Sequence, residues 1–350
     1  MRKRITLIIT CAGGTLVPAM LLHLRSSKIF DYRLVGVDSS GPGNSLPFLD
    51  AYATLPSGED EGYVEALLAL CLREGVQFVL PGSDGEAQTL SRAMQRFGLQ
   101  GITILASPPE TLDLIQDKAR TFANLEAAGI AVPAYSLVTT PEQAAEALRE
   151  YGYPDKTLVM KPSRGRGGRG MHVFCGKEGA ESWLGTGQRE HRVENAALEP
   201  ELLARYLETS GTLVMPVLTT PSYDIDVLPL AGDYFAIPRK RWNPTGIPFV
   251  GNTLVADPEL VGYGRRIASA LKLGALHDID LMTDAEGRAV VLEVNPRPSG
   301  SLSASLHAGF PLLDWLVAER MGMEVEPVRL TSDVEMEPAA FSLIVPKARG

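Results

Sequence analysis

The stretch VVLEVNPRPSGS, residues 290–301, carries a row of polar side chains inside an otherwise apolar strand. Its apolar residues run into a loop rich in proline, serine and glycine, which is typical of a buried strand and its exit turn. Glu293, Asn295 and Arg297 nevertheless follow one another at every second position. Because alternate residues of a strand point to one face, we expect a carboxylate, an amide and a guanidinium on the same side of it.

Composition and charge indicate a globular protein of enzyme size. The 350 residues are 45% hydrophobic and 21% charged, and this length favours two or three subdomains. The net charge of -9 argues against non-specific nucleic-acid binding, which needs a basic excess. Three scattered cysteines without a CxxC pair predict reduced thiols in a cytoplasmic protein. No stretch is long enough to cross a membrane, and the five histidines show no paired metal spacing.

The first hundred residues follow the order of a doubly wound α/β unit. An apolar run at residues 5–10, a Gly13-Gly14 turn, a helical pattern and the strand RLVGVD ending at Asp38 come one after another, as in a Rossmann-like domain. The basic start and Cys11 also resemble a lipoprotein signal, but the apolar run is short for one. The turn CAGGTLVP lacks the GxGxxG spacing, which favours a plain α/β domain over a dinucleotide site.

Three acidic residues of this unit are candidate substrate contacts. Asp38 ends a predicted strand, and Asp84 and Glu86 follow another. Loops at the carboxyl ends of such strands commonly bind ligands. Acidic residues in these loops also commonly cap helices, so both roles remain open.

A glycine- and arginine-rich loop follows in TLVMKPSRGRGGRGMHVF, residues 157–174. An apolar strand ends at Lys161, seven of the residues 163–170 are glycine or arginine, and a second strand returns. Such a loop can fold its backbone N–H groups over phosphate oxygens, and Lys161 would add a positive charge. It is not a Walker loop, which leads into a helix. The alternative is a basic hairpin without a ligand, but the placement of Lys161 favours a nucleotide.

These motifs occur in the order found in ATP-grasp enzymes, which the chain resembles over roughly residues 5–321. The motifs are Lys118 on a helix predicted to begin at residue 107, the Lys161 loop, LVMPVL, SYDIDVLP, IPRKRWNPTG and the Glu293-x-Asn295-x-Arg297 strand with Asp280 on the strand before it. The resemblance is to carboxylate–amine ligases related to carbamoyl-phosphate-synthase-like proteins.

The resemblance implies an α/β fold class that becomes α+β in the C-terminal part. Residues 1–106 would form a Rossmann-like pre-ATP-grasp domain. Residues 107–212 would form the N-terminal part of the ATP-grasp fold, with the glycine-rich lid, and residues 213–350 its C-terminal part, with the metal site. Two antiparallel sheets would hold ATP between them.

The resemblance also assigns Asp280, Glu293 and Asn295 to the metal ions, Mg²⁺ or Mn²⁺, that hold the ATP phosphates. Two carboxylates and a carbonyl oxygen are ligands that such cations prefer. The alternative is a half-exposed hairpin with a polar face, which the apolar flanks of Glu293 disfavour. Arg297, further along the same face, would stabilise charge on the transferring phosphoryl group.

The remaining family positions are expected to contact the nucleotide. They are Lys118, Lys161, Ser163, Gly167, Gly168, Met215, Val217, Ser222 and Asp224. Met215 and Val217 would run past the adenine, which backbone groups mainly recognise in the family. Many relatives carry a ribose-binding Glu where Ser222 stands, so the ribose contact is either lost or moved to Asp224.

Arg239 and Arg241, in IPRKRWNPTG, match an R-x-R signal of the family. As catalytic residues they would clamp a phosphate or a substrate carboxylate. The alternative is solvated charge on an edge strand.

The implied activity is an ADP-forming ligase. A substrate carboxylate would attack the γ-phosphate to give an acyl phosphate, and an amine would displace phosphate to form an amide or peptide bond. Such transfer needs positioning and charge rather than a protein nucleophile. The expected partners are small carboxylates and amines, amino acids among them, and a possible second copy of the chain. The alternatives are an ATP-grasp carboxylase or kinase, an ATP-binding sensor or partner subunit without turnover, and an NAD(P) oxidoreductase.

Overall fold

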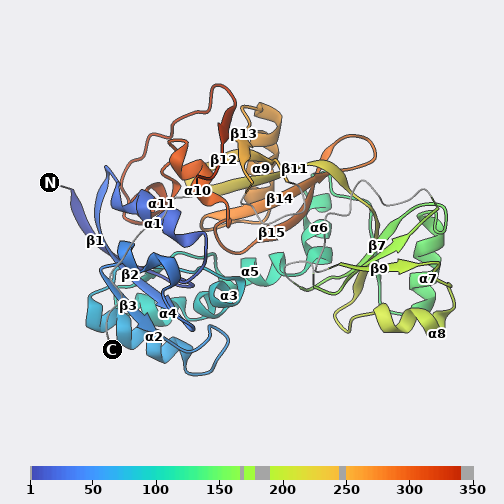
Figure 1. The fold of residues 1–350 in the computed structure, drawn as a ribbon, viewed down its shortest axis with the longest axis horizontal. Helices are drawn as coiled ribbons and strands as arrows, with labels where there is room; N and C mark the ends of the chain where they lie inside the picture. Colours follow the sequence, from blue (N-terminus) through green and yellow to red (C-terminus); the bar gives the residue numbers. More distant parts are fainter. Residues whose placement is uncertain (1, 166–168, 178–189, 244–249, 340–350) are drawn as a thin grey trace.

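The structure is a computed structural model that describes residues 2–165, 169–177, 190–243 and 250–339. Three sheets organise this part of the chain, and Figure 1 shows the first and third together while the second stands apart. Gly167 and Gly168, two of the predicted nucleotide-binding residues, lie outside the described residues. The mixed α/β fold class, with a parallel N-terminal sheet and an antiparallel C-terminal one, is confirmed.

The first sheet is parallel and has the strand order β3-β2-β1-β4-β5. Its strands are β1 (Lys3–Ile9), β2 (Phe30–Asp38), β3 (Ala51–Thr54), β4 (Phe78–Leu80) and β5 (Thr103–Ile104). The helices between them are α1 (Val17–Arg25), η1 (Gly43–Phe48), α2 (Tyr63–Glu74), α3 (Asp84–Arg92) and α4 (Met94–Gly98). Because the strand order reverses between β1 and β4, the loops after these two strands open at a topological switch point, where α/β sheets commonly bind ligands.

The turn after β1 explains the role of Asp38. Its carboxylate accepts hydrogen bonds from the backbone N–H groups of Gly13 (3.0 Å) and Ser40 (2.9 Å). A Cβ atom on Gly13 would collide with the carbonyl oxygen of Gly41, so glycine is needed for this close approach. The Asp38 carboxylate thus binds backbone N–H groups of two turns and does not cap a helix, which was the alternative to a substrate contact.

Two helices, rather than the single predicted one, connect the first sheet to the second. They are α5 (Pro109–Ile115) and α6 (Lys118–Ala127). Asp117 interrupts the helical pattern because its side chain caps α6, accepting from the N–H of Arg120 (3.2 Å), and also pairs with Arg164 (3.1 Å). The break places Lys118 in the first turn of α6, beside the start of the glycine-rich loop.

The second sheet has the order β6-β10-β7-β8-β9. Its strands are β6 (Ser136–Val138), β7 (Leu158–Pro162), β8 (Met171–Cys175), β9 (Glu190–Glu194) and β10 (Thr212–Pro216), and its helices are α7 (Pro141–Glu150), α8 (Pro200–Leu203) and η2 (Ala204–Tyr206). The pairs are antiparallel except β8 with β9, which is parallel. The expectation of a purely antiparallel sheet is therefore wrong at this one pair.

The third sheet has the order β15-β14-β11-β12-β13-β16, and every pair is antiparallel. Its strands are β11 (Thr219–Leu230), β12 (Asp233–Arg241), β13 (Asn252–Leu254), β14 (His277–Thr283), β15 (Ala289–Asn295) and β16 (Val334–Met336). Its helices are α9 (Pro258–Ala270), α10 (Leu302–His307) and α11 (Leu312–Arg320). The predicted hairpin of residues 277–295 is thus confirmed as β14 and β15 at one edge of this sheet.

The first and third sheets share one hydrophobic core. Leu21 and Leu24 of α1 belong to the same buried cluster as Leu302, Leu306 and Trp315 of the C-terminal helices. A buried polar contact joins the same two parts, because the carboxylate of Asp314 accepts hydrogen bonds from the hydroxyl groups of Ser27 (3.0 Å) and Tyr32 (2.8 Å). The N-terminal unit therefore forms a fixed wall beside the third sheet.

The predicted domain boundaries at residues 106/107 and 212/213 remain predictions. The strands of the first sheet end at Ile104, whereas β10 of the second sheet crosses the later division. No helix in the described ranges combines the length and the hydropathy needed to cross a membrane.

Candidate active site

The hairpin of β14 and β15 brings the predicted metal ligands face to face. Asp280 lies opposite Glu293, and Asp278 lies opposite Asn295. The register shifts immediately after Asp280, where Leu281 pairs with Val291, so Leu292 is an extra residue on β15. Such a bulge bends a strand and redirects its side chains. Asn295 also donates a hydrogen bond from Nδ2 to Asp278 Oδ2 (3.2 Å).

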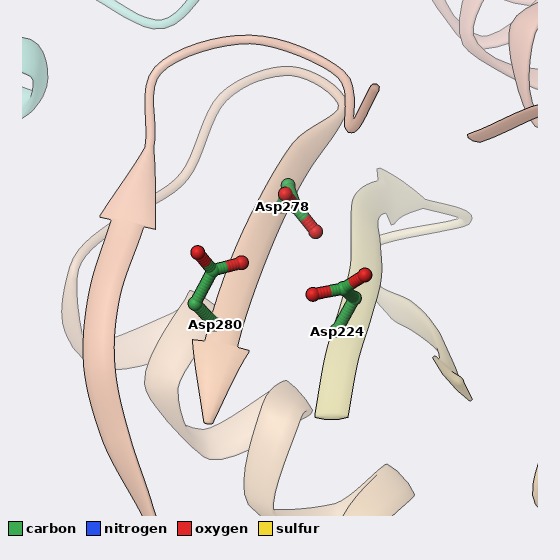
Figure 2. Close-up of side chains that lie close together, drawn as sticks. All are labelled: Asp224, Asp278 and Asp280. Carbon is green, nitrogen blue, oxygen red and sulfur yellow. The ribbon is translucent and has the colours of Figure 1, made fainter. Parts of the chain in front are cut away.

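A second carboxylate pair comes from the neighbouring strand. On β11, Asp224 pairs with Asp280 and Asp226 with Asp278. One carboxylate oxygen from each of Asp224, Asp278 and Asp280 lies within 4.8 Å of the other two. Figure 2 shows the three side chains converging from two strands. Asp278 and Asp226 were not among the predicted site residues. The matching DID sequences at residues 224–226 and 278–280 are the signal that could have revealed them.

Burial of these carboxylates gives them unusual acidities. Burial, reinforced by repulsion from Asp224, raises the pKa of Asp278 to about 7. Burial likewise raises the pKa of Asp280 well above its ordinary value. Burial acts in the same direction on Asp224, but the two arginines beside it hold its pKa below the usual range. The cluster therefore holds more acidic groups than its arginines neutralise.

Arg239 is the buried counter-charge of this cluster. Its side chain is 0% exposed and donates two hydrogen bonds to Asp226 (3.0 and 2.9 Å) and one to Asp224 (3.3 Å). Burial alone would lower the pKa of this guanidinium, but the charges of Asp226 and Asp224 raise it above the ordinary value. Since β12 lies inside the sheet, solvated edge-strand charge is wrong for Arg239. Its full burial favours a positioning role over the predicted contact with substrate.

Arg241 lies at the open side of the same carboxylates. It donates from Nε to Asp224 Oδ1 (2.6 Å) and from Nη2 to Asp280 Oδ1 (3.0 Å), and its side chain is 24% exposed. Burial of Arg241 lowers its pKa, but the charges of Asp280 and Asp224 outweigh this and raise the pKa above the ordinary value. Of the two predicted catalytic arginines on β12, Arg241 is therefore the one that a ligand can reach.

Two lysines face the hairpin from the other side. Lys118 Nζ lies 3.3 Å from Glu293 Oε2 and donates a hydrogen bond to the carbonyl oxygen of Gly165 (2.9 Å). Burial, together with repulsion from Lys118, lowers the pKa of Lys161 to about 7. Burial opposes ionisation of Glu293, but the two lysines keep its pKa below the ordinary value. A cavity of about 520 Å³ is bordered by Lys118, Glu293 and Asn295.

Ser163 has a scaffolding position. It is 1% exposed, its hydroxyl donates to Asp117 Oδ1 (2.5 Å), and its carbonyl oxygen accepts from the N–H of Lys118 (2.9 Å). These bonds tie β7 to the start of α6, and so fix Lys161 and Lys118 relative to each other. The hydroxyl is already engaged, which disfavours the predicted direct contact of Ser163 with nucleotide.

The residues predicted to contact adenine and ribose have different surroundings in the structure. Met215 belongs to a buried apolar cluster with Val159 of the second sheet and Met282 of the third, and Val217 packs against it. The Ser222 hydroxyl is buried and has no hydrogen-bond partner within the described part of the chain. Asp224 is 0% exposed and is held by Arg239 and Arg241, so its placement favours the acidic cluster over the predicted ribose contact.

Arg297 links the hairpin to the N-terminal unit. Its Nε donates to Asp84 Oδ1 (3.1 Å) at the start of α3, and its Nη1 donates to the carbonyl oxygen of Pro298 (3.0 Å). Burial works against its charge, but Asp84 and the hairpin carboxylates raise its pKa. The structure therefore brings Arg297 close to the other predicted site residues.

The donor set fits a hard divalent cation. Asp224, Asp278, Asp280, Glu293 and Asn295 supply only oxygen ligands for it, as Mg²⁺ and Mn²⁺ prefer. Within the described residues, the buried Asp278 Oδ1 atom has no hydrogen-bond partner. A cation here would also offset the excess of acidic groups.

Two family models match parts of the chain. Residues 208–340 match the model "ATP-grasp in the biosynthetic pathway with Ter operon", and residues 8–105 match the model "PylC-like, N-terminal domain". The chain carries an ATP-grasp domain. This domain includes β11 to β16 and hence the whole acidic cluster.

Curated relatives of this ATP-grasp chain are carbamoyl phosphate synthase large chains. The protein from Clostridium acetobutylicum is 24% identical over 297 residues, which cover 81% of this chain and 26% of that protein. The protein from Thermomicrobium roseum is 30% identical over 225 residues, or 61% of this chain and 19% of that one. The chain thus spans about a quarter or less of the length of these relatives.

Solved structures share the fold over nearly the whole ATP-grasp chain. Biotin carboxylase from Campylobacter jejuni, in complex with β,γ-ATP, has a TM-score of 0.70 and 16% identity, covering 92% of this chain and 72% of that one. N5-carboxyaminoimidazole synthetase from Staphylococcus aureus, complexed with ADP, has a TM-score of 0.67 and 14% identity, covering 93% and 80%. L-amino acid ligase from Bacillus licheniformis has a TM-score of 0.63 and 16% identity, covering 94% and 78%.

The buried arginine gives a stability prediction. Replacing Arg239 by Met leaves Asp224, Asp226 and Asp278 without their shared counter-charge, and we expect a loss of about 3–5 kcal/mol in the free energy of unfolding. Urea unfolding measures it. The matched control is Arg265→Met, because Arg265 and Asp233 form an ion pair with side chains 44% and 60% exposed, and such pairs contribute about 1 kcal/mol or less. Equal losses in both variants would contradict the role given to Arg239.

Proposed function

We propose that the chain is an ATP-dependent, ADP-forming carboxylate–amine ligase that works through an acyl phosphate. The observation that supports this most directly is the arrangement around β14 and β15. Oxygen ligands for a divalent cation lie on the hairpin. Lys118 of α6 and Lys161 of β7 face it, and Arg241 and Arg297 border it. Phosphoryl transfer needs such charged groups, because its catalysis consists mainly of positioning the reactants and stabilising charge.

Each group has a chemical task in the proposal. Lys118 and Lys161 bind the phosphate oxygens of ATP, and Glu293 keeps both ammonium groups in place. Asp280, Glu293 and Asn295, extended by Asp278, would hold Mg²⁺ or Mn²⁺, which neutralises phosphate charge when bound.

The arginines complete the reaction site. Arg297 stabilises negative charge as the γ-phosphoryl group passes to the substrate carboxylate, and Arg241 contacts the same groups from β12. The leaving group is ADP. An amine then attacks the acyl carbon and phosphate departs, which forms the amide bond.

Trapping the intermediate tests this proposal. Hydroxylamine converts acyl phosphates into hydroxamates, so the protein with ATP, Mg²⁺ and a panel of amino acids and small carboxylates should release ADP and form a hydroxamate in step with it. A parallel reaction with bicarbonate alone tests for a carboxylase. ADP release that needs only bicarbonate, or binding of ATP without carboxylate-dependent release, would reject the ligase.

The acidity of Lys161 predicts a proton uptake. Its pKa of about 7 leaves it mostly neutral in the free protein at about pH 8, whereas an ordinary lysine is charged there. Phosphate oxygens favour the charged form, so ATP binding should take up close to one proton, and affinity should fall as pH rises above about 7. Calorimetry in two buffers of different ionisation enthalpy measures the uptake. Lys161→Arg, always charged, should abolish it, and an unchanged uptake in that variant would contradict the assignment.

A further inference from the structure

A second cavity lies at the switch point of the first sheet. It has a volume of about 540 Å³ and is bordered by the loops after β1, β3 and β4, by α1, by the loop after β15 and by Arg169. This is within the usual range for small-molecule sites, about 300–1,000 Å³. Its lining shares Glu59, Asp84 and Gly85 with the cavity beside Lys118 and Glu293. A molecule bound here therefore lies next to the proposed phosphoryl-transfer site.

A buried carboxylate forms one wall of this cavity. Glu86 is 6% exposed, and its Oε2 atom accepts hydrogen bonds from Thr10 Oγ1 (2.7 Å), Cys11 Sγ (2.9 Å) and Ser83 Oγ (2.9 Å). Its Oε1 atom accepts one from the Tyr63 hydroxyl (3.2 Å). Three of the four donors therefore converge on Oε2, and Oε1 accepts only the hydrogen bond from Tyr63 within the described residues. Oε1 is the less occupied oxygen and the one better able to accept from a ligand.

Glu86 forms no ion pair within the described residues, although Arg169 and Arg297 line the same cavity. All four groups that donate to Glu86 are hydroxyls or a thiol. Burial raises the pKa of Cys11 to about 12, so the thiol donates to Glu86 and is not a nucleophile. A buried charge is normally paired. The missing partner of Glu86 is therefore expected in a ligand.

The rest of the cavity supplies the opposite charge and an apolar wall. The guanidinium groups of Arg169 and Arg297 line it together with the acidic Glu59 and Asp84. Val17, Met20 and Leu302 are among its apolar residues. One ligand in this space meets a carboxylate, a guanidinium and aliphatic side chains. These features match the ammonium, the carboxylate and the side chain of an apolar amino acid.

We propose that this cavity binds the carboxylate substrate as an amino acid with an apolar side chain, whose ammonium group is recognised by Glu86. The substrate carboxylate lies at Arg297, beside the phosphate cavity, and its side chain packs against α1 and α10. The assignment of this amino acid as the group that is phosphorylated rests on the proposed ligase function. The recognition of the ammonium group by Glu86 stands independently of turnover.

Matched pairs of ligands test the proposal on the unmodified protein. The probes are leucine, methionine and phenylalanine, each compared with its analogue that lacks the amino group, namely 4-methylpentanoate, 4-(methylthio)butanoate and 3-phenylpropanoate. Calorimetry in the presence of Mg²⁺ and a non-hydrolysable ATP analogue gives the affinities. We expect at least one amino acid to bind roughly 10- to 100-fold more tightly than its analogue, as for a hydrogen bond to a charged group. Affinities within about twofold for all three pairs would overturn the proposal.

A variant locates the effect. Glu86→Gln should abolish the preference for the amino acid over its analogue and leave the affinity of the analogue unchanged. The control is Glu65→Gln on α2, an exposed residue paired with Arg96, which should keep the preference. A preference that survives in folded Glu86→Gln protein would overturn the role of Glu86. If that variant fails to fold, the comparison of the ligand pairs on the unmodified protein still tests whether the cavity recognises an ammonium group.

The two proposals fail in different ways. If the amino acids bind with the expected preference but no hydroxamate forms, the cavity assignment stands and the ligase proposal falls. If hydroxamate forms from carboxylates without any preference for an amino group, the ligase stands and this inference falls.

Discussion

Glu293→Ala should retain the fold and lose nearly all ADP release, to about 1% of the original rate or less. Glu293 faces Asp280 across the hairpin and lies 3.3 Å from Lys118. Its removal deletes a predicted metal ligand and leaves two buried lysines without their carboxylate. Steady-state ADP release at fixed Mg²⁺ concentration measures the effect, and circular dichroism with thermal unfolding verifies the fold.

A residue of the same hairpin provides the control. Glu286 lies in the turn between β14 and β15 and pairs with Arg288, with side chains 64% and 61% exposed. Glu286→Ala should therefore change ADP release by less than about twofold, since exposed ion pairs contribute little. Production of ADP by Glu293→Ala at the original rate, at equal metal concentration, would remove the hairpin from the active site.

Arg297→Ala should lower the rate of ADP release by about 100-fold while ATP affinity falls much less. A charge that is useful mainly where negative charge develops affects turnover more than ground-state binding. Arg297 is held by Asp84 and by the carbonyl oxygen of Pro298, so its position is fixed before substrate arrives. ADP release and calorimetric ATP affinity, measured side by side, give the two quantities.

Two further variants sharpen the result. Arg288→Ala, in the exposed turn of the hairpin, should leave both quantities unchanged. Asp84→Asn keeps the arginine but removes the charge that orients it, and it should produce a smaller loss of rate. If Arg297→Ala loses rate and affinity in equal measure, Arg297 binds nucleotide and has no special role in the transition state. An ATP-binding sensor would show an effect on binding alone.

The polar row on β15 could be predicted because it depends only on the chain's own periodicity. A strand presents alternate residues to one face wherever it pairs, so Glu293, Asn295 and Arg297 could be grouped from the sequence. The first α/β unit was predictable for a similar reason, since its strands, turns and helices follow in chain order.

The partners of that row could not be predicted in the same way. Asp224 and Asp278 join the site because β11 pairs with β14 in one particular register, and sequence patterns do not specify which strands pair. The same applies to Arg239, for which solvated charge on an edge strand was the alternative to a catalytic role. Its burial depends on β12 lying between β11 and β13. Asp117 lies within a stretch predicted as one helix. In the structure its side chain caps α6 through the N–H of Arg120 and also contacts Ser163 and Arg164, two contacts that no local pattern indicates.

The shared core of the first and third sheets has a mechanical consequence. Leu21, Leu302 and Trp315 belong to one apolar cluster, and Asp314 is bonded to Ser27 and Tyr32 within it. Separating these two parts would expose that cluster to water, which resists their relative movement. The second sheet has a core of its own. It meets the third sheet through Leu213 of β10, which belongs to a buried cluster with Ile225 and Ile279, and through an apolar cluster around Met215 and Met282. The acidic hairpin therefore lies on the part that shares its core with the N-terminal unit, whereas Lys161 lies on a sheet with a separate core.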